Sequence, residues 1–208
     1  MKMYFVRHGE TDWNVNKKIQ GSADIPLNEN GRRQAGELAA RLAGLQKEGE
    51  FQAVRVYTSP QLRASETAET VAEALGLSCI SLDGLREMSM GKWEGMSWNR
   101  VREEFPGEYR AWNSHRRYRK TPEGESYQDV VSRAFSAIAY ILEREQEDVL
   151  VVTHSAVLMA VRCYMDNCPF KEREMLGRYR ADNTEVVELS GEELARAVKQ
   201  FHEEEQRS

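Results

Sequence analysis

Strand-like and helical segments alternate along this 208-residue chain. Short runs typical of strands lie at residues 2–6, 51–59, 77–82, 148–154 and 184–190. Helical spacing of apolar residues marks 27–45, 60–75, 124–145 and 155–165, and a last helix begins at 191 and frays over 202–208. Because parallel strands need crossover helices on the faces of their sheet, the alternation predicts an α/β fold, a three-layer α/β/α sandwich with a mostly parallel sheet.

No linker or repeat interrupts this alternation, so we expect a single domain over residues 1–208. The pattern becomes irregular only between residues 88 and 122, where Trp, Tyr and Arg are frequent. We interpret this stretch as a small cap insertion. Its basic run, 114–120, has two interpretations. It binds a second anionic group of the substrate, or it is a solvated basic surface with a small apolar cluster packed beneath it.

Basic side chains follow the strands at the points where the strands end. Arg7 and His8 follow the first strand, His154 ends the run 148–154, and Arg63 lies in the first turn of the helix after 51–59. The carboxyl ends of parallel strands meet at one edge of a sheet, which is where such folds bind ligands. Arginines grip tetrahedral oxyanions, and the helix beginning near Ser155 adds N–H groups, so the edge is predicted to hold a phosphoryl group.

Two histidines at such an edge indicate chemistry beyond binding. A neutral imidazole attacks phosphorus when one ring nitrogen is exposed and the other is held by a hydrogen bond, and we assign this role to His8. Gly9 has no Cβ and so lets the backbone approach the ring closely. The leaving alcohol needs a proton, and Glu87, just past the third strand, is the candidate donor because a neighbouring phosphate raises the pKa of a carboxyl group. Taken singly, each of these residues could have an ordinary structural role.

Five blocks of the sequence, in this order, resemble the histidine phosphatase superfamily, also called phosphoglycerate-mutase-like. They are RHGETDWN, QGSADIPLNENGRRQA, TSPQLRASETA, LREMSMGKWEG and VVTHS. The resemblance covers most of the chain and implies that His8 becomes phosphorylated, that Glu87 donates the proton, and that His154 is the second histidine of the site. It also implies that Arg7, Arg63 and Asn14 contact phosphate and that Gln20 and Gly21 touch the substrate. The family usually has glycine after the second histidine, whereas this chain has Ser155, whose backbone N–H can still bind phosphate.

The residues and the resemblance together predict a phosphomonoesterase that hydrolyses a small phosphorylated metabolite through a phosphohistidine. The alternatives are a phosphoglycerate mutase and a non-catalytic phosphate-binding regulatory module. The stretches WEGMSWNRVREEFP and TPEGESYQDVVSR look more like the phosphatase branch, which includes alpha-ribazole phosphatases and broad-specificity phosphatases.

The composition of the chain limits the kinds of partner and cofactor that we expect. A net charge of −5 argues against a nucleic-acid-binding protein, and no run approaches the ~20 apolar residues of a membrane span. We expect no cofactor and no metal, because Arg7, Arg63 and the histidines meet the phosphate charge and no cluster with ligand spacing is present. Three cysteines without metal-ligand spacing fit free thiols in a reducing cytoplasm, and charged residues interrupt the N-terminal apolar run before it could form a signal peptide. We expect a monomer or a homodimer.

Overall fold

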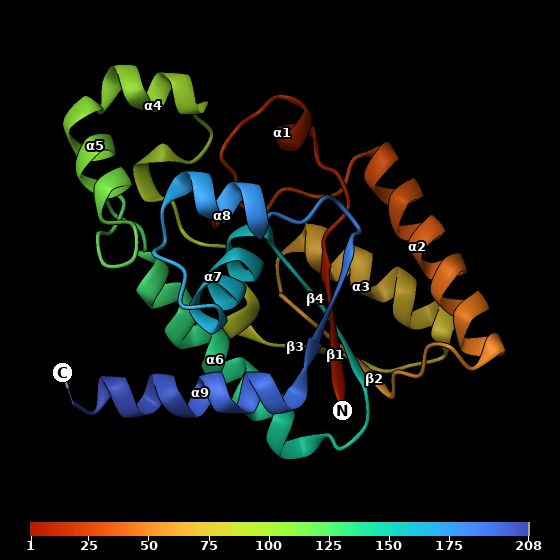
Figure 1. Cartoon of the computed structure of the whole chain (residues 1–208). Helices are drawn as coiled ribbons and strands as arrows, with labels where there is room; N and C mark the ends of the chain where they lie inside the picture. Colours follow the sequence, from red (N-terminus) through yellow and green to blue (C-terminus); the bar gives the residue numbers. More distant parts are fainter. Residues whose placement is uncertain (208) are drawn as a thin grey trace.

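A five-stranded sheet forms the centre of the computed structural model, which describes residues 1–207 (Figure 1). The strands are β1 (Lys2–Arg7), β2 (Arg55–Thr58), β3 (Cys79–Ser81), β4 (Val149–Thr153) and β5 (Val186–Ser190). Their order is β3-β2-β4-β1-β5, with β5 antiparallel to β1 and the other pairs parallel. The predicted mostly parallel sheet is confirmed.

Helices cover both faces of this sheet (Figure 1). The helices α2 (Glu29–Glu48) and α3 (Leu62–Leu75) pack on one face, and α6 (Tyr127–Arg144), α7 (Ser155–Met165) and α9 (Gly191–Glu205) pack on the other. Alternate residues of β1 point to opposite faces of the sheet. Met3 and Phe5 pack in the core beneath α6, α7 and α9, and Tyr4 and Val6 pack in the core beneath α2 and α3. This alternation follows from the two-residue period of a strand and confirms the three-layer sandwich.

Several predicted boundaries were wrong. Strand β2 begins at Arg55 instead of residue 51, because Phe51 is buried by packing on the Tyr4 ring, 4.9 Å away, without joining the ladder. Strand β3 has only three residues. Helix α9 continues to Glu205 through the region predicted to fray, since Phe201 is fully buried. For β2, packing that the local pattern does not report decides where the strand begins.

The stretch predicted to be irregular contains two short helices. They are α4 (Trp98–Glu104) and α5 (Pro106–Ser114), preceded by the 3₁₀ turn η2 (Gly91–Trp93). The Trp98 and Trp112 rings stack with centroids 5.6 Å apart, and Trp93 meets Trp112 edge-on at 5.4 Å. Aromatic packing therefore organises this segment, and the structure adds three further short elements that the sequence pattern did not indicate: α1 (Asp12–Val15), η1 (Asp83–Leu85) and α8 (Glu172–Arg178).

The sheet brings the ends of β1 and β4 side by side. Arg7 pairs with Thr153 across the two strands, and the N–H of His8 donates to the carbonyl O of Thr153 at 3.0 Å. Residues 8 and 154 therefore leave the same edge together. Within residues 1–207, none of the helices has the length and apolar character that crossing a bilayer requires.

Candidate active site

Four basic side chains that are distant in sequence lie together, buried, at the carboxyl edge of the sheet. Exposed fractions are 7% for Arg7, 2% for His8 and 0% for both Arg63 and His154. The two imidazole rings have centroids 5.1 Å apart. Burial of two guanidinium groups beside two histidines is unfavourable unless an anion joins them, so this cluster has the character of an anion site.

The His8 ring is held in one tautomer. Its Nδ1 lies 2.7 Å from the carbonyl O of Gly9, and because a carbonyl only accepts hydrogen bonds, Nδ1 carries the proton. Burial lowers the pKa of His8 well below its ordinary value, and the charges of Arg63 and Arg7 lower it further. The ring is therefore neutral near pH 7, with a lone pair on Nε2.

Gly9 also allows a second close approach, which the sequence did not indicate. A Cβ on Gly9 would lie 2.6 Å from the carbonyl O of Gly31, in the first turn of α2. This approach is between two backbone segments, so the absent side chain makes room for α2. The Gly9 carbonyl O also lies 2.7 Å from the His8 ring.

Both arginines are anchored at the tips of their guanidinium groups. Nη1 of Arg7 donates to the carbonyl O of Ala181 at 2.9 Å. In Arg63, Nη1 donates to Ala23 at 2.8 Å and Nη2 to Gly21 at 2.9 Å. The Nε atoms of both residues are buried and, among residues 1–207, have no hydrogen-bond partner. Unsatisfied buried donors are costly, which indicates that a ligand completes them.

His154 presents a further donor. Its Nε2 lies 2.8 Å from Oγ of Ser59, which also accepts the N–H of Gln61 at 3.3 Å. The Ser59 hydroxyl has a second lone pair, so it can donate to Nε2 or accept from it. We adopt the donating arrangement, which puts the ring proton on Nδ1. That Nδ1 is buried and has no partner within the described residues. Burial lowers the pKa of His154 well below its ordinary value, so this ring is also neutral near pH 7.

Glu87 lies on the rim after η1 and is half-buried. One carboxyl oxygen, Oε1, accepts the N–H groups of Ala156 and Met88, each at 3.1 Å. The structure gives Oε2 no partner among residues 1–207, so this oxygen can carry a proton. Burial raises the pKa of Glu87, although Arg63, the Met88 N–H and Arg7 oppose the shift. The helix α7 was expected to offer N–H groups to phosphate near Ser155, and one N–H of its first turn, that of Ala156, binds the Glu87 carboxyl group.

The four predicted substrate-binding residues line two nearby segments. Asn14 accepts the N–H of Thr11 at 3.1 Å, and Gln20 accepts the Thr11 hydroxyl at 3.0 Å, so the amide oxygen is the engaged atom in each. Gly21 has a φ of +52°, a conformation that favours glycine, and Ser155 is the first residue of α7.

Sequence reasoning missed several residues that hold the site. The side chain of Gln61 donates to the carbonyl O of Gly21 at 3.0 Å and accepts the N–H of Glu87 at 2.7 Å. Asn183 donates to the carbonyl O of His8 at 2.7 Å. Arg133 on α6 donates to the carbonyl O of Glu87 at 3.1 Å. Gln61 lies inside a recognised block, but nothing local to Asn183 or Arg133 signals a role.

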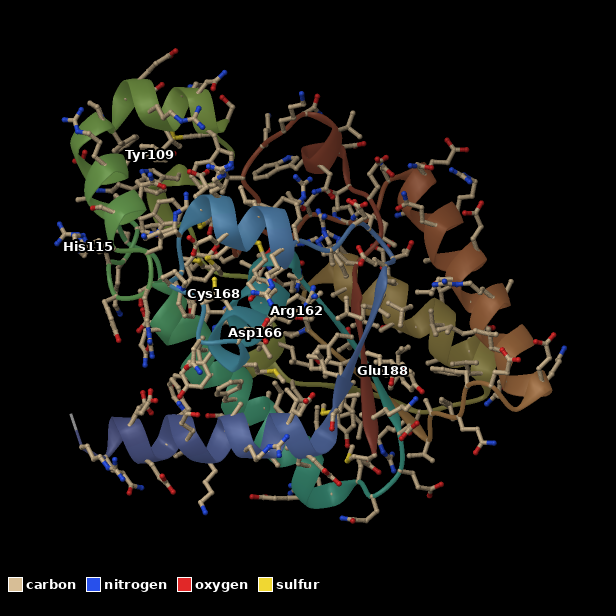
Figure 2. The ribbon with its side chains drawn as sticks, in the orientation of Figure 1. Tyr109, His115, Arg162, Asp166, Cys168 and Glu188 are labelled. Carbon is tan, nitrogen blue, oxygen red and sulfur yellow. The ribbon has the colours of Figure 1, made fainter. Side chains whose placement is uncertain are left out.

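The basic run of the insertion does not join this cluster. Arg116 is buried, lies 4.1 Å from the centre of the Trp112 ring and pairs with Glu172 of α8 at 3.1 Å. Arg117 pairs with Glu204 at 3.6 Å. His115 is exposed and lies at the outer edge of the molecule (Figure 2). The structure therefore favours packing over anion binding for this run.

The described part of the chain, residues 1–207, contains no group of three or more His, Cys, Asp or Glu residues that could hold a metal ion.

Three similar proteins place the chain among phosphatases and mutase-like proteins. Phosphoglycerate mutase-like protein 4 of Arabidopsis thaliana is 36% identical over 75% of the chain and 67% of its own length. The metal-independent phosphoserine phosphatase of the same organism is 35% identical over 77% of the chain and 66% of its own length. The alpha-ribazole phosphatase from Shigella flexneri, a crystal structure, superposes with a TM-score of 0.75 and 26% identity over 91% of the chain and 90% of that protein.

The matched region spans about two thirds of the length of these curated relatives. The sequence model described as histidine phosphatase superfamily (branch 1) matches residues 3–204, nearly the whole chain. The phosphatase names among the relatives support the class of reaction predicted from the sequence. The resemblance seen in the five blocks is confirmed, and the chain belongs to the histidine phosphatase superfamily.

Proposed function

We propose that this protein is a phosphomonoesterase that forms a phosphohistidine on Nε2 of His8. The observation that carries the proposal is a set of buried, unpartnered nitrogens in the cluster that contains His8. His8 is neutral with Nδ1 engaged, and Arg7 Nε, Arg63 Nε and His154 Nδ1 are unpartnered donors within the described residues. Three donors and a nucleophile match the needs of a phosphoryl group undergoing in-line attack.

The proposed reaction has two steps. In the first, the His8 Nε2 lone pair attacks phosphorus, the bond from phosphorus to the ester oxygen breaks, and that oxygen takes the proton from Glu87 Oε2. In the second, water attacks the phosphohistidine and gives a proton to the Glu87 carboxylate. The N–P bond then breaks, its electron pair returns to Nε2, and inorganic phosphate leaves. Arg7, Arg63 and His154 stabilise the phosphoryl charge in both steps.

No metal or cofactor enters these steps, because two guanidinium groups meet the phosphate charge. One relative is named a metal-independent phosphoserine phosphatase, which supports this part of the proposal. The substrate we propose is a small phosphorylated metabolite, because the site sits at a sheet edge whose polar groups suit a single phosphoryl group.

The second candidate is a phosphoglycerate mutase, favoured by the relative named phosphoglycerate mutase-like. A mutase uses the same nucleophile but returns the phosphoryl group to a second alcohol. The third candidate, a non-catalytic phosphate-binding module, requires that His8 never become phosphorylated.

One experiment separates the three. A panel of phosphate esters is assayed for release of inorganic phosphate, with and without added phosphoglycerate, while acid-labile phosphate on the protein is measured in parallel. Phosphate release with a transient phosphoenzyme supports the phosphatase. Transfer to phosphoglycerate with little release points to the mutase, and binding without phosphoenzyme points to the module.

We further propose a cytoplasmic protein that is a monomer or homodimer with one domain. The three cysteines among the described residues are free thiols, which supports a reducing setting. Size-exclusion chromatography with light scattering tests the oligomeric state.

A further inference from the structure

The loop that carries Gln20 and Gly21 is joined to the insertion. Lys18 and Ser97 form an isolated antiparallel bridge. Next to it, the N–H of Ile19 donates to Met96 at 2.9 Å and the N–H of Gly95 donates to Ile19 at 2.8 Å. A segment of the phosphate site and a segment of the insertion therefore share a short ladder, although about 75 residues separate them in sequence.

The Glu94 carboxylate continues this ladder. Its Oε1 accepts the N–H of Ser22 at 2.8 Å and the N–H of Met90 at 3.0 Å. The Ser22 hydroxyl lies 2.9 Å from each carboxylate oxygen. The carboxylate also packs against Gly21, since a Cβ there would overlap Oε1. Glu94 thus contacts two successive residues of the loop.

The Arg63 side chain donates hydrogen bonds to the same loop. The carbonyl groups of Gly21 and Ala23 accept its two Nη atoms, while the N–H of the intervening Ser22 points to Glu94. Both Nη atoms are committed to this loop, so the position of the loop sets where the unpartnered Arg63 Nε lies. The Glu94 charge also acts on Arg63. Burial lowers the pKa of Arg63, and the negative charges of Glu87, Asp24 and Glu94 oppose this by raising it.

We propose that Glu94 is a positioning residue for the phosphate site, which orients Arg63 through the loop of residues 21–23. The inference rests on the proposed function in that it takes Arg63 as a phosphate ligand. The insertion therefore contributes to phosphate binding through the Glu94 carboxylate and not through its basic run, 114–120.

The test is a double-mutant cycle read by binding of inorganic phosphate. Glu94→Ala, Arg63→Ala and the double variant are titrated with phosphate by calorimetry, and kcat and KM are measured separately. Glu94→Ala is expected to weaken phosphate binding about tenfold in the wild-type background and to have little effect once Arg63 is absent, because the two residues act through one loop. Glu94→Gln, which keeps the shape, is expected to fall between wild type and Glu94→Ala.

The matched control is Glu123→Gln, another carboxylate in this region, which is exposed and pairs with Lys92 at 2.7 Å without touching the loop. It is expected to bind phosphate as wild type does. Equal losses from Glu94→Ala with and without Arg63, or unchanged phosphate binding in both Glu94 variants, would overturn the inference. Phosphate binding with the expected coupling but no turnover would refute the phosphatase while leaving the role of Glu94 intact.

Discussion

Replacement of Glu87 by glutamine removes the proposed proton donor with little change of shape. The Oε1 atom of Glu87 accepts two backbone N–H groups, and the glutamine amide oxygen can accept both. The other position becomes an NH2 group, which cannot transfer a proton to a leaving oxygen. The fold should therefore survive, so a change in rate reports the chemistry of this one atom.

The expected loss depends on the leaving group. An alkyl phosphate must release an alkoxide of high pKa, so its hydrolysis needs the acid, whereas a nitrophenolate departs nearly unaided. Glu87→Gln is expected to lower kcat/KM about 10²–10⁴-fold for an alkyl phosphate. That loss corresponds to roughly 2.7–5.4 kcal/mol of transition-state stabilisation. The nitrophenyl ester should lose much less.

The pH profile provides a second readout of the same atom. Burial raises the pKa of Glu87, so the acid form persists closer to neutral pH and its deprotonation gives the basic limb of the rate profile. That limb should weaken in Glu87→Gln. The control is Arg63→Ala, which removes a phosphate ligand and should slow both esters to a similar degree. Equal losses for the two esters in Glu87→Gln would refute the assignment, and another group on the rim would have to supply the proton.

Four further predictions follow from the site and its supports. His8→Ala should abolish both turnover and phosphoenzyme formation, and burst phosphorylation by that variant would contradict the assignment of the nucleophile. Activity should be unaffected by excess chelator, because arginines carry the charge; a loss restored by magnesium would refute this. Because burial holds the pKa values of His8 and His154 well below 6.5, the unfolded chain binds more protons than the folded one below that pH. Urea melts should therefore show that the free energy of unfolding falls as the pH drops below 6.5. The fall is up to about 1.4 kcal/mol per pH unit for each histidine, until the pKa of the folded state is reached. Equal stability at pH 7 and about pH 5.5 would contradict this. Gly9→Ala should be strongly destabilising, because its Cβ would lie 2.6 Å from the Gly31 carbonyl O, whereas Gly36→Ala, in open space within α2, should stabilise the protein by about 0.5–1 kcal/mol in thermal melts.

The sequence by itself determined the family, the layered fold and the edge at which the chemistry is expected. Local periodicity encodes strands and helices, and the rule that parallel strands end at one edge then brings Arg7, His8 and His154 together without any coordinates. The helix following β2 carries Arg63 to the same place, and the short motifs around these residues carry the family resemblance. The roles assigned to these residues stay predictions until the variants are measured.

Only the tertiary structure decided how these side chains are held. The hydrogen-bond partner of His154 Nε2 is Ser59, and the direction of Arg63 depends on carbonyl groups of residues 21 and 23. The helices of the insertion form around stacked tryptophans, and Arg116, expected to be a ligand or a solvated charge, is buried against Trp112. The contacts of His154 and Arg63 join segments that are distant in sequence, and those of the insertion join side chains whose pairing its local pattern did not indicate. A local pattern reports which face of an element is buried, but it does not report which partner buries it, because that choice is made by the packing of the whole chain.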